Sequence, residues 1–254
     1  MRKIAIITGA SSGIGAAAAL AFAKRGVHSI VTYNSSEEGA LRVVDEVNRE
    51  GAVAKPLRLN VGQSGTFASF RANVVAMLER EWRTQRFDYL VNNAGFGQMA
   101  TFEDTTEELF DKLTRVLLKG PYFLTQTLLP LMADGGAIVN VASNSAMTTG
   151  LTRGYSAYAS MKGGLITLSR YMAKEFAPRG IRVNSVSPGA TRTGMITDEV
   201  LAKYPDVIAA LVQTTAFGRL GEPSDIGSVI AALASDEFRW VTGQNIEASG
   251  GFRL

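Results

Sequence analysis

Near its start the chain reads Lys3-Ile-Ala-Ile-Ile-Thr8-Gly9-Ala10-Ser11-Ser12-Gly13-Ile14-Gly15, and an alanine-rich stretch follows. The residues from Lys3 to Thr8 are apolar and mostly β-branched on consecutive positions, which is typical of a strand buried on both faces. The stretch 13–25 has helical composition. The sequence therefore predicts a buried strand, a tight glycine-rich turn and a helix.

The three glycines of this turn have different uses. Gly9 lets the chain turn tightly, Gly13 removes a side chain where a pyrophosphate would approach, and Gly15 lets the helix pack closely on the strand. Free amides and the dipole at a helix N-terminus favour an anion there. A tight strand-to-helix loop alone would also explain the glycines, but their position after a buried first strand favours a dinucleotide site.

Strand-length apolar runs alternate with helix-length stretches over the rest of the chain. This order predicts right-handed crossovers and a parallel sheet covered on both faces. We therefore expect an α/β fold with one doubly wound, Rossmann-like domain over residues 1–254 and about seven strands. The expected strands are 3–8, 29–33, 52–59, 87–91, 137–141, 181–186 and 245–248, and the expected helices are 13–25, 37–50, 64–83, two segments within 105–132, 156–176 and 223–234, with 194–220 irregular or partly helical.

Composition excludes several classes of protein. Hydrophobic residues make up 46% and charged residues 19%, which indicates a globular chain. With no cysteine and one histidine, we expect no disulfide scaffold, no Cys nucleophile and no metal site. The net charge of +3 suits an anionic small ligand better than nucleic acid.

No segment is long and apolar enough to predict a membrane span. The longest apolar run, Ala16–Ala23, is far shorter than the ~20 residues that a membrane helix needs. The strand pattern begins at Ile4, which leaves no room for a signal peptide. We therefore expect a cytoplasmic protein.

Two residues of the predicted helix 156–176 suggest acid/base chemistry. Tyr158 and Lys162 stand four residues apart and so share a helix face. A lysine cation beside a phenol favours the phenolate, so we expect a lowered pKa for Tyr158 and proton exchange with a carbonyl or alcohol oxygen. Ser143, where a predicted strand ends, could hold the same oxygen. Taken alone, the pair could equally be an ordinary amphipathic feature.

Further motifs follow in order: Asn92-Asn93-Ala94-Gly95, Tyr158-Ala-Ser-Met-Lys162 and Asn184-Ser-Val-Ser-Pro188-Gly189. With the turn pattern T-G-x-x-x-G-x-G, the chain resembles the short-chain dehydrogenase/reductase family over its whole length, in particular the 3-oxoacyl-carrier-protein reductase-like members. The resemblance implies that Tyr158 is the acid/base, that Ser143 orients the substrate, and that Lys162 tunes the tyrosine and binds the ribose. Ser145 competes for the serine role, because it lies 13 residues before Tyr158, the commoner family spacing.

Cofactor residues are expected at the carboxyl ends of the strands. They are Gly9, Ser11, Ser12, Gly13, Ile14 and Gly15 in the turn; Tyr33, Asn34 and Ser35; Asn60 and Val61; Asn93, Ala94 and Gly95; Tyr158 and Lys162; and Pro188, Gly189, Thr191 and Thr193.

The end of the second strand bears on cofactor choice. NAD selectivity usually comes from an acidic residue there, which bonds the ribose 2′-hydroxyl. No carboxylate occurs before Glu37, so we expect NADP, with NAD possible as the alternative. No arginine stands beside this segment in the sequence.

Leu117 departs from the family pattern. The family usually has an asparagine at this place, which holds a water that connects the lysine to a proton relay, and leucine cannot bind that water. We expect Leu117 to pack in the core. This departure keeps open a catalytically weak nucleotide-binding sensor or scaffold as an alternative function.

The leading prediction is an NADP-dependent reductase of a ketone or aldehyde, with 3-oxoacyl thioester reduction as the alternative chemistry and nucleic-acid binding as a distant third. Substrate residues are expected at Gln98, Ser145, Tyr155 and Met195, with a substrate loop at about 190–220. The resemblance also implies a homo-oligomer, a dimer or a homotetramer, that is formed through the long helices.

Overall fold

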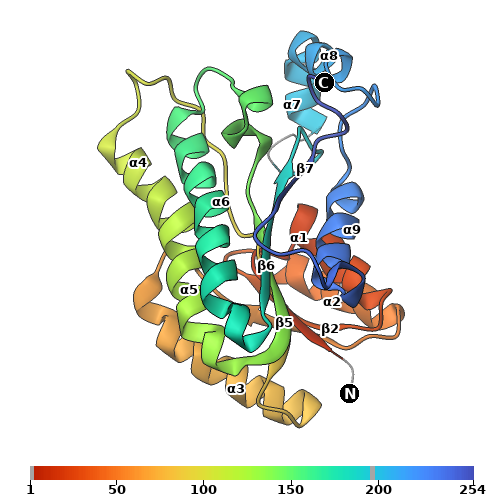
Figure 1. Cartoon of the computed structure of the whole chain (residues 1–254). Helices are drawn as coiled ribbons and strands as arrows, with labels where there is room; N and C mark the ends of the chain where they lie inside the picture. Colours follow the sequence, from red (N-terminus) through yellow and green to blue (C-terminus); the bar gives the residue numbers. More distant parts are fainter. Residues whose placement is uncertain (1–2, 195–197) are drawn as a thin grey trace.

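The computed structural model describes residues 3–194 and 198–254, and its centre is a seven-stranded parallel sheet (Figure 1). The strand order is β3-β2-β1-β4-β5-β6-β7, which confirms the doubly wound arrangement. The strands are β1 (Ile4–Ile7), β2 (His28–Tyr33), β3 (Ala54–Arg58), β4 (Phe87–Asn92), β5 (Met132–Val141), β6 (Arg182–Pro188) and β7 (Asn245–Ala248).

Helices cover both faces of this sheet, and two apolar cores form beneath them (Figure 1). Helices α1, α2 and α9 pack on one face, and α3, α5 and α6 pack on the other. The helices are α1 (Gly13–Ala23), α2 (Glu37–Arg49), α3 (Phe67–Trp82), α4 (Glu107–Thr114), α5 (Gly120–Leu128), α6 (Ser156–Phe176), α7 (Asp198–Lys203), α8 (Pro205–Gln213) and α9 (Pro223–Ala234).

Strand β1 lies inside the sheet between β2 and β4, and all four of its residues are buried. The strand order reverses between β1 and β4, which makes their carboxyl ends the topological switch point where such sheets bind ligands. The glycine-rich turn and the segment after β4 therefore meet at one edge.

One predicted strand boundary is wrong, whereas the two helical segments predicted within 105–132 are confirmed. Strand β5 begins at Met132 instead of residue 137, and its pairing with β4 shifts register between Phe87 and Tyr89. Gly135 there has a φ of +76°, which lets the strand continue through the irregularity. The segment 105–132 is divided by a π-helical turn over Arg115–Lys119, which lies between α4 and α5.

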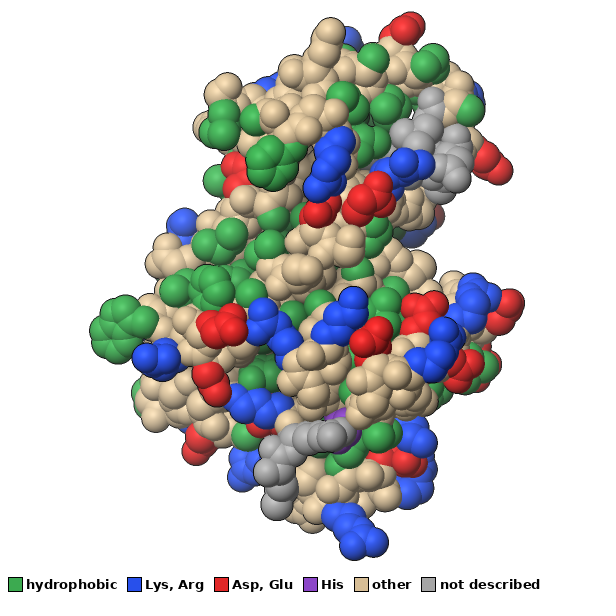
Figure 2. Space-filling view, turned by 90° about the vertical axis from the view of Figure 1, so that its right-hand side faces the viewer, with side chains coloured by type: hydrophobic (Ala, Val, Ile, Leu, Met, Phe, Trp, Pro, Cys, Tyr) green, Lys and Arg blue, Asp and Glu red, His purple; other side chains and the backbone are tan. Residues whose placement is uncertain are grey.

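Basic and acidic side chains alternate over the face that Figure 2 displays. Ion pairs Lys3–Asp236 and Arg25–Glu237 (3.1 and 3.3 Å) connect the start of β1 and the end of α1 to the segment after α9. Among the described residues, no helix has the length and apolarity to cross a membrane.

Candidate functional site

The glycine-rich turn is tied by hydrogen bonds to the segment after β4. The Thr8 hydroxyl accepts from the backbone amides of Asn93 and Ala94 (both 2.9 Å). The Asn93 side chain donates to the carbonyls of Thr8 and Gly9 (2.8 and 3.1 Å). A Cβ on Gly9 would lie 2.8 Å from the Cα of Ala94, so the close contact requires glycine. Asn93, predicted as a cofactor residue, therefore also supports the turn that faces the cofactor.

The start of α1 has the features of an anion site. Its N-cap residue, Ser12, makes no side-chain capping bond, and the first turn contains no acidic residue. Gly13 has a φ of +56°, and a Cβ there would contact Thr193 at 3.6 Å. The uncompensated helix dipole and the bare glycine fit a pyrophosphate, which would lie between this turn and Thr193.

The edge beyond β2 contains a cation that the sequence analysis missed. Tyr33 pairs with Arg58 in the β2–β3 register, so both side chains leave the same face of the sheet. Burial and a hydrogen bond to Glu37 raise the pKa of Tyr33, whereas the charge of Arg58 lowers it in part. No arginine stands beside this segment in the sequence, but strand pairing places Arg58 of β3 beside Tyr33. The sequence did contain a signal for this contact: β2 and β3 were both predicted, and the ends of neighbouring parallel strands lie side by side.

Other predicted cofactor residues follow strands β3 and β6. Asn60 accepts from the amide of Gly62 through its side-chain oxygen (2.9 Å). Gly189 lies so close to β7 that a Cβ would be 2.8 Å from the Cα of Ser249. Thr191 is buried, and its hydroxyl donates to the Gly189 carbonyl (2.9 Å), so it stabilises this turn.

Tyr158, Lys162 and Ser143 lie together at the carboxyl end of β5. The Lys162 ammonium donates to the carbonyl of Val141 (2.7 Å) and lies 5.8 Å from the centre of the Tyr158 ring. A side-chain interaction with Ser143 acts on the pKa of Tyr158 and lowers it in part. The hydroxyls of Ser143 and Ser145 are 3.2 Å apart, and the Ser145 amide donates to Ser143 (3.2 Å). Ser143 and Ser145 therefore both lie at this end of β5, bonded to each other.

The electrostatics of this group differ from the prediction. Burial raises the pKa of Tyr158 to about 12, although the interaction with Ser143 partly lowers it. Burial lowers the pKa of Lys162 to about 8. The expected lowering of the tyrosine pKa is absent here because burial disfavours the phenolate, and Lys162 is not among the groups that shift this pKa.

Leu117 packs in the core, as predicted. It is 1% exposed and belongs to an apolar cluster with Tyr158 and Met161. A Cβ on Gly95 would lie 3.0 Å from the Leu117 side chain and 3.7 Å from the Lys162 ammonium. The leucine is therefore a neighbour of the lysine, and the π-helical turn that presents it forms without asparagine.

Leu117→Asn is expected to destabilise the protein by about 3 kcal/mol, because it buries an amide and removes apolar contact. For a chain of this size the melting temperature should fall by about 5–10 °C. The control is Leu41→Asn, at a half-exposed position of α2, which should change it little. An unchanged melting temperature together with faster turnover would mean that the site still accommodates a water.

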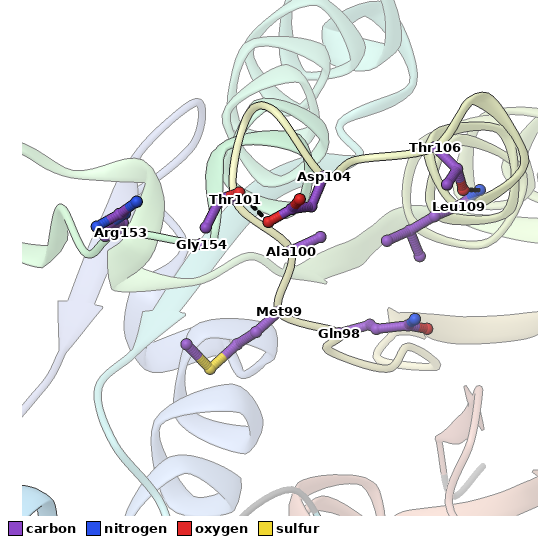
Figure 3. Close-up of a pocket in the computed structure, with 9 residues that line it drawn as sticks. All are labelled: Gln98, Met99, Ala100, Thr101, Asp104, Thr106, Leu109, Arg153 and Gly154. Atoms are coloured by element: carbon purple, nitrogen blue, oxygen red, sulfur yellow. Dashed lines mark hydrogen bonds between the residues drawn. The ribbon is translucent and has the colours of Figure 1, made fainter.

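Of the predicted substrate residues, Gln98 lines a cavity, whereas Ser145 and Tyr155 lie beside Ser143 and Tyr158. A cavity of about 790 Å³ is lined by Gln98, Met99, Ala100, Thr101, Asp104, Thr106, Leu109, Arg153 and Gly154 (Figure 3). Leu109 belongs to the same apolar cluster as Tyr158, and Tyr155 packs against it, with its ring edge-on to Tyr158 (5.8 Å). The cavity thus adjoins the Tyr158 site. Met195 lies outside the described residues.

Comparisons with known proteins found a matching family and similar oxidoreductases. The profile of a family described as enoyl-(acyl carrier protein) reductase matches residues 9–253. An uncharacterized oxidoreductase of Methylorubrum extorquens is 40% identical over 99% of this chain and 98% of its own length.

Two solved ketoreductases are also similar. The promiscuous reductase LugOII, which catalyses keto-reduction at C1 during lugdunomycin biosynthesis, has a TM-score of 0.92 and 37% identity over 99% of this chain and 98% of its own. The angucycline C-6 ketoreductase LanV, solved with bound NADP, has a TM-score of 0.92 and 34% identity over 99% of this chain and 96% of its own.

Proposed function

Because the chain belongs to the short-chain dehydrogenase/reductase family of oxidoreductases, we propose that it is an NADP-dependent ketoreductase with Tyr158 as its general acid. The observation that carries this proposal is the cluster of Ser143, Tyr158 and Lys162 beside the glycine-rich turn. The reduced nicotinamide, when bound, supplies the hydride that the carbonyl carbon accepts.

The side chains of the site have separate tasks in this proposal. The Tyr158 hydroxyl gives its proton to the carbonyl oxygen, because a phenol with a pKa of about 12 is fully protonated at neutral pH. Ser143 holds the same oxygen through its hydroxyl. Lys162 stabilises the phenolate that remains and donates to the ribose. The turn from Gly9 to Gly15 binds the pyrophosphate.

The proposed cofactor is NADP because of the cation beyond β2. Arg58 and the hydroxyls after Tyr33 offer donors to a 2′-phosphate, and no carboxylate precedes Glu37 there. The ketoreductase LanV was solved with NADP, which supports the same choice.

The proposed substrate is a ketone on a fused aromatic ring system, the chemical class of the angucycline that LanV reduces. The cavity has a volume within the range of small-molecule sites, Leu109 lines it, and Tyr155 packs against the apolar cluster that contains Leu109. A planar ring system would gain apolar contact there, whereas the exposed rim offers polar partners.

The test is an activity assay on a panel of carbonyl compounds, in which the loss of NADPH absorbance measures turnover. We expect turnover of 1-tetralone and larger fused-ring ketones with NADPH, and weaker turnover with NADH. Arg58→Ala should raise the NADPH dissociation constant about tenfold and leave that for NADH unchanged, because it removes one charged contact to the 2′-phosphate.

The matched control is Arg49→Ala, at the exposed end of α2, which should change neither constant. If the enzyme turned over 3-oxoacyl thioesters and no fused-ring ketone, the proposed substrate class would be wrong. Thermal stabilisation by NADPH without turnover of any carbonyl would favour the sensor.

A further inference from the structure

The segment Gly250–Arg253 is joined by backbone hydrogen bonds to the residues that follow α8 (Figure 1). The amides of Ala216 and Phe217 donate to the carbonyls of Gly251 and Gly250 (3.2 and 3.1 Å), and the Arg253 amide donates to Thr214 (2.8 Å). A Cβ on Gly251 would lie only 2.7 Å from the Cβ of Ala216. The segment is therefore packed tightly against the end of the predicted substrate loop.

The side chain of Arg253 connects the same segment to a second loop. Its guanidinium donates to the carbonyls of Thr149 and Leu151 (3.1 and 3.3 Å). A third bond reaches this loop from β7, because the Thr149 hydroxyl donates to Glu247 (3.3 Å). The loop 148–154 lies between Ser145 and Tyr155 in the chain. Its position therefore affects two residues that lie beside the candidate acid, Tyr158.

The backbone of Arg253 has a φ of +53°, in the left-handed region that residues other than glycine rarely adopt. Such a conformation persists where the surrounding bonds hold it, and it is a reason to ask what the residue does. In this conformation the Arg253 amide donates to Thr214 at the end of α8, while the Arg253 side chain donates to the 148–154 loop.

We propose that Arg253 is a positioning residue for the ketone, which couples the segment after α8 to the loop between Ser145 and Tyr155. The inference rests on the proposed function, because Arg153 and Gly154 of this loop line the proposed substrate cavity. The arginine side chain is exposed, so its bonds add little to the stability of the whole fold but order an otherwise exposed loop.

Two measurements test the coupling on the full chain. In Arg253→Ala, amides of residues 144–155 should exchange with deuterium faster than in the wild type. KM for 1-tetralone should rise about threefold to tenfold, which corresponds to the loss of one or two exposed hydrogen bonds, with an unchanged NADPH dissociation constant. Arg253→Lys, which keeps a donor for one carbonyl, should be intermediate. Arg239→Ala, at an exposed arginine after α9, is the matched control and should match the wild type.

Unchanged exchange and unchanged KM in Arg253→Ala would overturn the proposal. Equal losses in KM, NADPH affinity and melting temperature would also overturn it, since they would indicate a general structural role. If the wild type turned over no ketone, the proposed function would fail, and the exchange measurement would still decide whether Arg253 orders the loop.

Discussion

Tyr158→Phe is expected to lower ketone turnover by about 10²–10⁴-fold and to leave NADPH binding intact. The substitution removes one hydroxyl, and general acids contribute rate factors of this size. The ring remains in its apolar cluster with Leu117 and Met161, so the fold should be retained. The measurements are kcat with a ketone that the wild type reduces and the dissociation constant of NADPH.

The control for this variant is Tyr155→Phe, whose ring stands edge-on to Tyr158 at 5.8 Å. It should keep most of the turnover, because Tyr155 has no lysine four residues later. The pH dependence provides a second check. Burial raises the pKa of Tyr158 to about 12, so the phenol stays protonated near neutral pH. The rate of ketone reduction should therefore be independent of this group there, whereas the rate of alcohol oxidation, which needs the phenolate, should rise with pH. Near wild-type reduction by Tyr158→Phe would remove Tyr158 from the mechanism.

Lys162→Met is expected to abolish most turnover and weaken NADPH binding, yet to stabilise the unliganded protein. Burial lowers the pKa of Lys162 from 10.5 to about 8, so the ammonium is costly in the folded state. That difference is worth about 3 kcal/mol, and loss of the bond to Val141 offsets part of it, which leaves a net gain of about 2 kcal/mol.

The sign of this effect depends on pH. Stability contributed by a lowered lysine pKa is present above pH 10.5, where both states are neutral, and is lost as pH falls through 8. The variant Lys162→Met should therefore gain about 2 kcal/mol below pH 8 and show a small loss near pH 10.5, where only the missing bond to Val141 remains, as measured by thermal unfolding. Lys174→Met, at an exposed position of α6, should show neither change. Destabilisation at every pH would instead make Lys162 a structural residue.

The local sequence predicted the first strand, the glycine-rich turn and the shared helix face of Tyr158 and Lys162. Each of these features depends on neighbours in the chain. Consecutive apolar residues from Ile4 to Ile7 form a buried strand, and residues four positions apart in a helix lie on the same face. The strand alternation also predicted the doubly wound sheet, because crossover rules leave few topologies.

Tertiary structure alone decided the electrostatics and the contacts between distant segments. Arg58 lies beside Tyr33 because β3 pairs with β2 in that register, and Arg253 bonds the loop at Thr149 from 104 residues away. The pKa values of Tyr158 and Lys162 follow from burial, which opposes the charged form of each group and which no residue spacing reveals. Spacing along the chain determines which side chains share a face, whereas desolvation and long-range contacts exist only once the layers have packed.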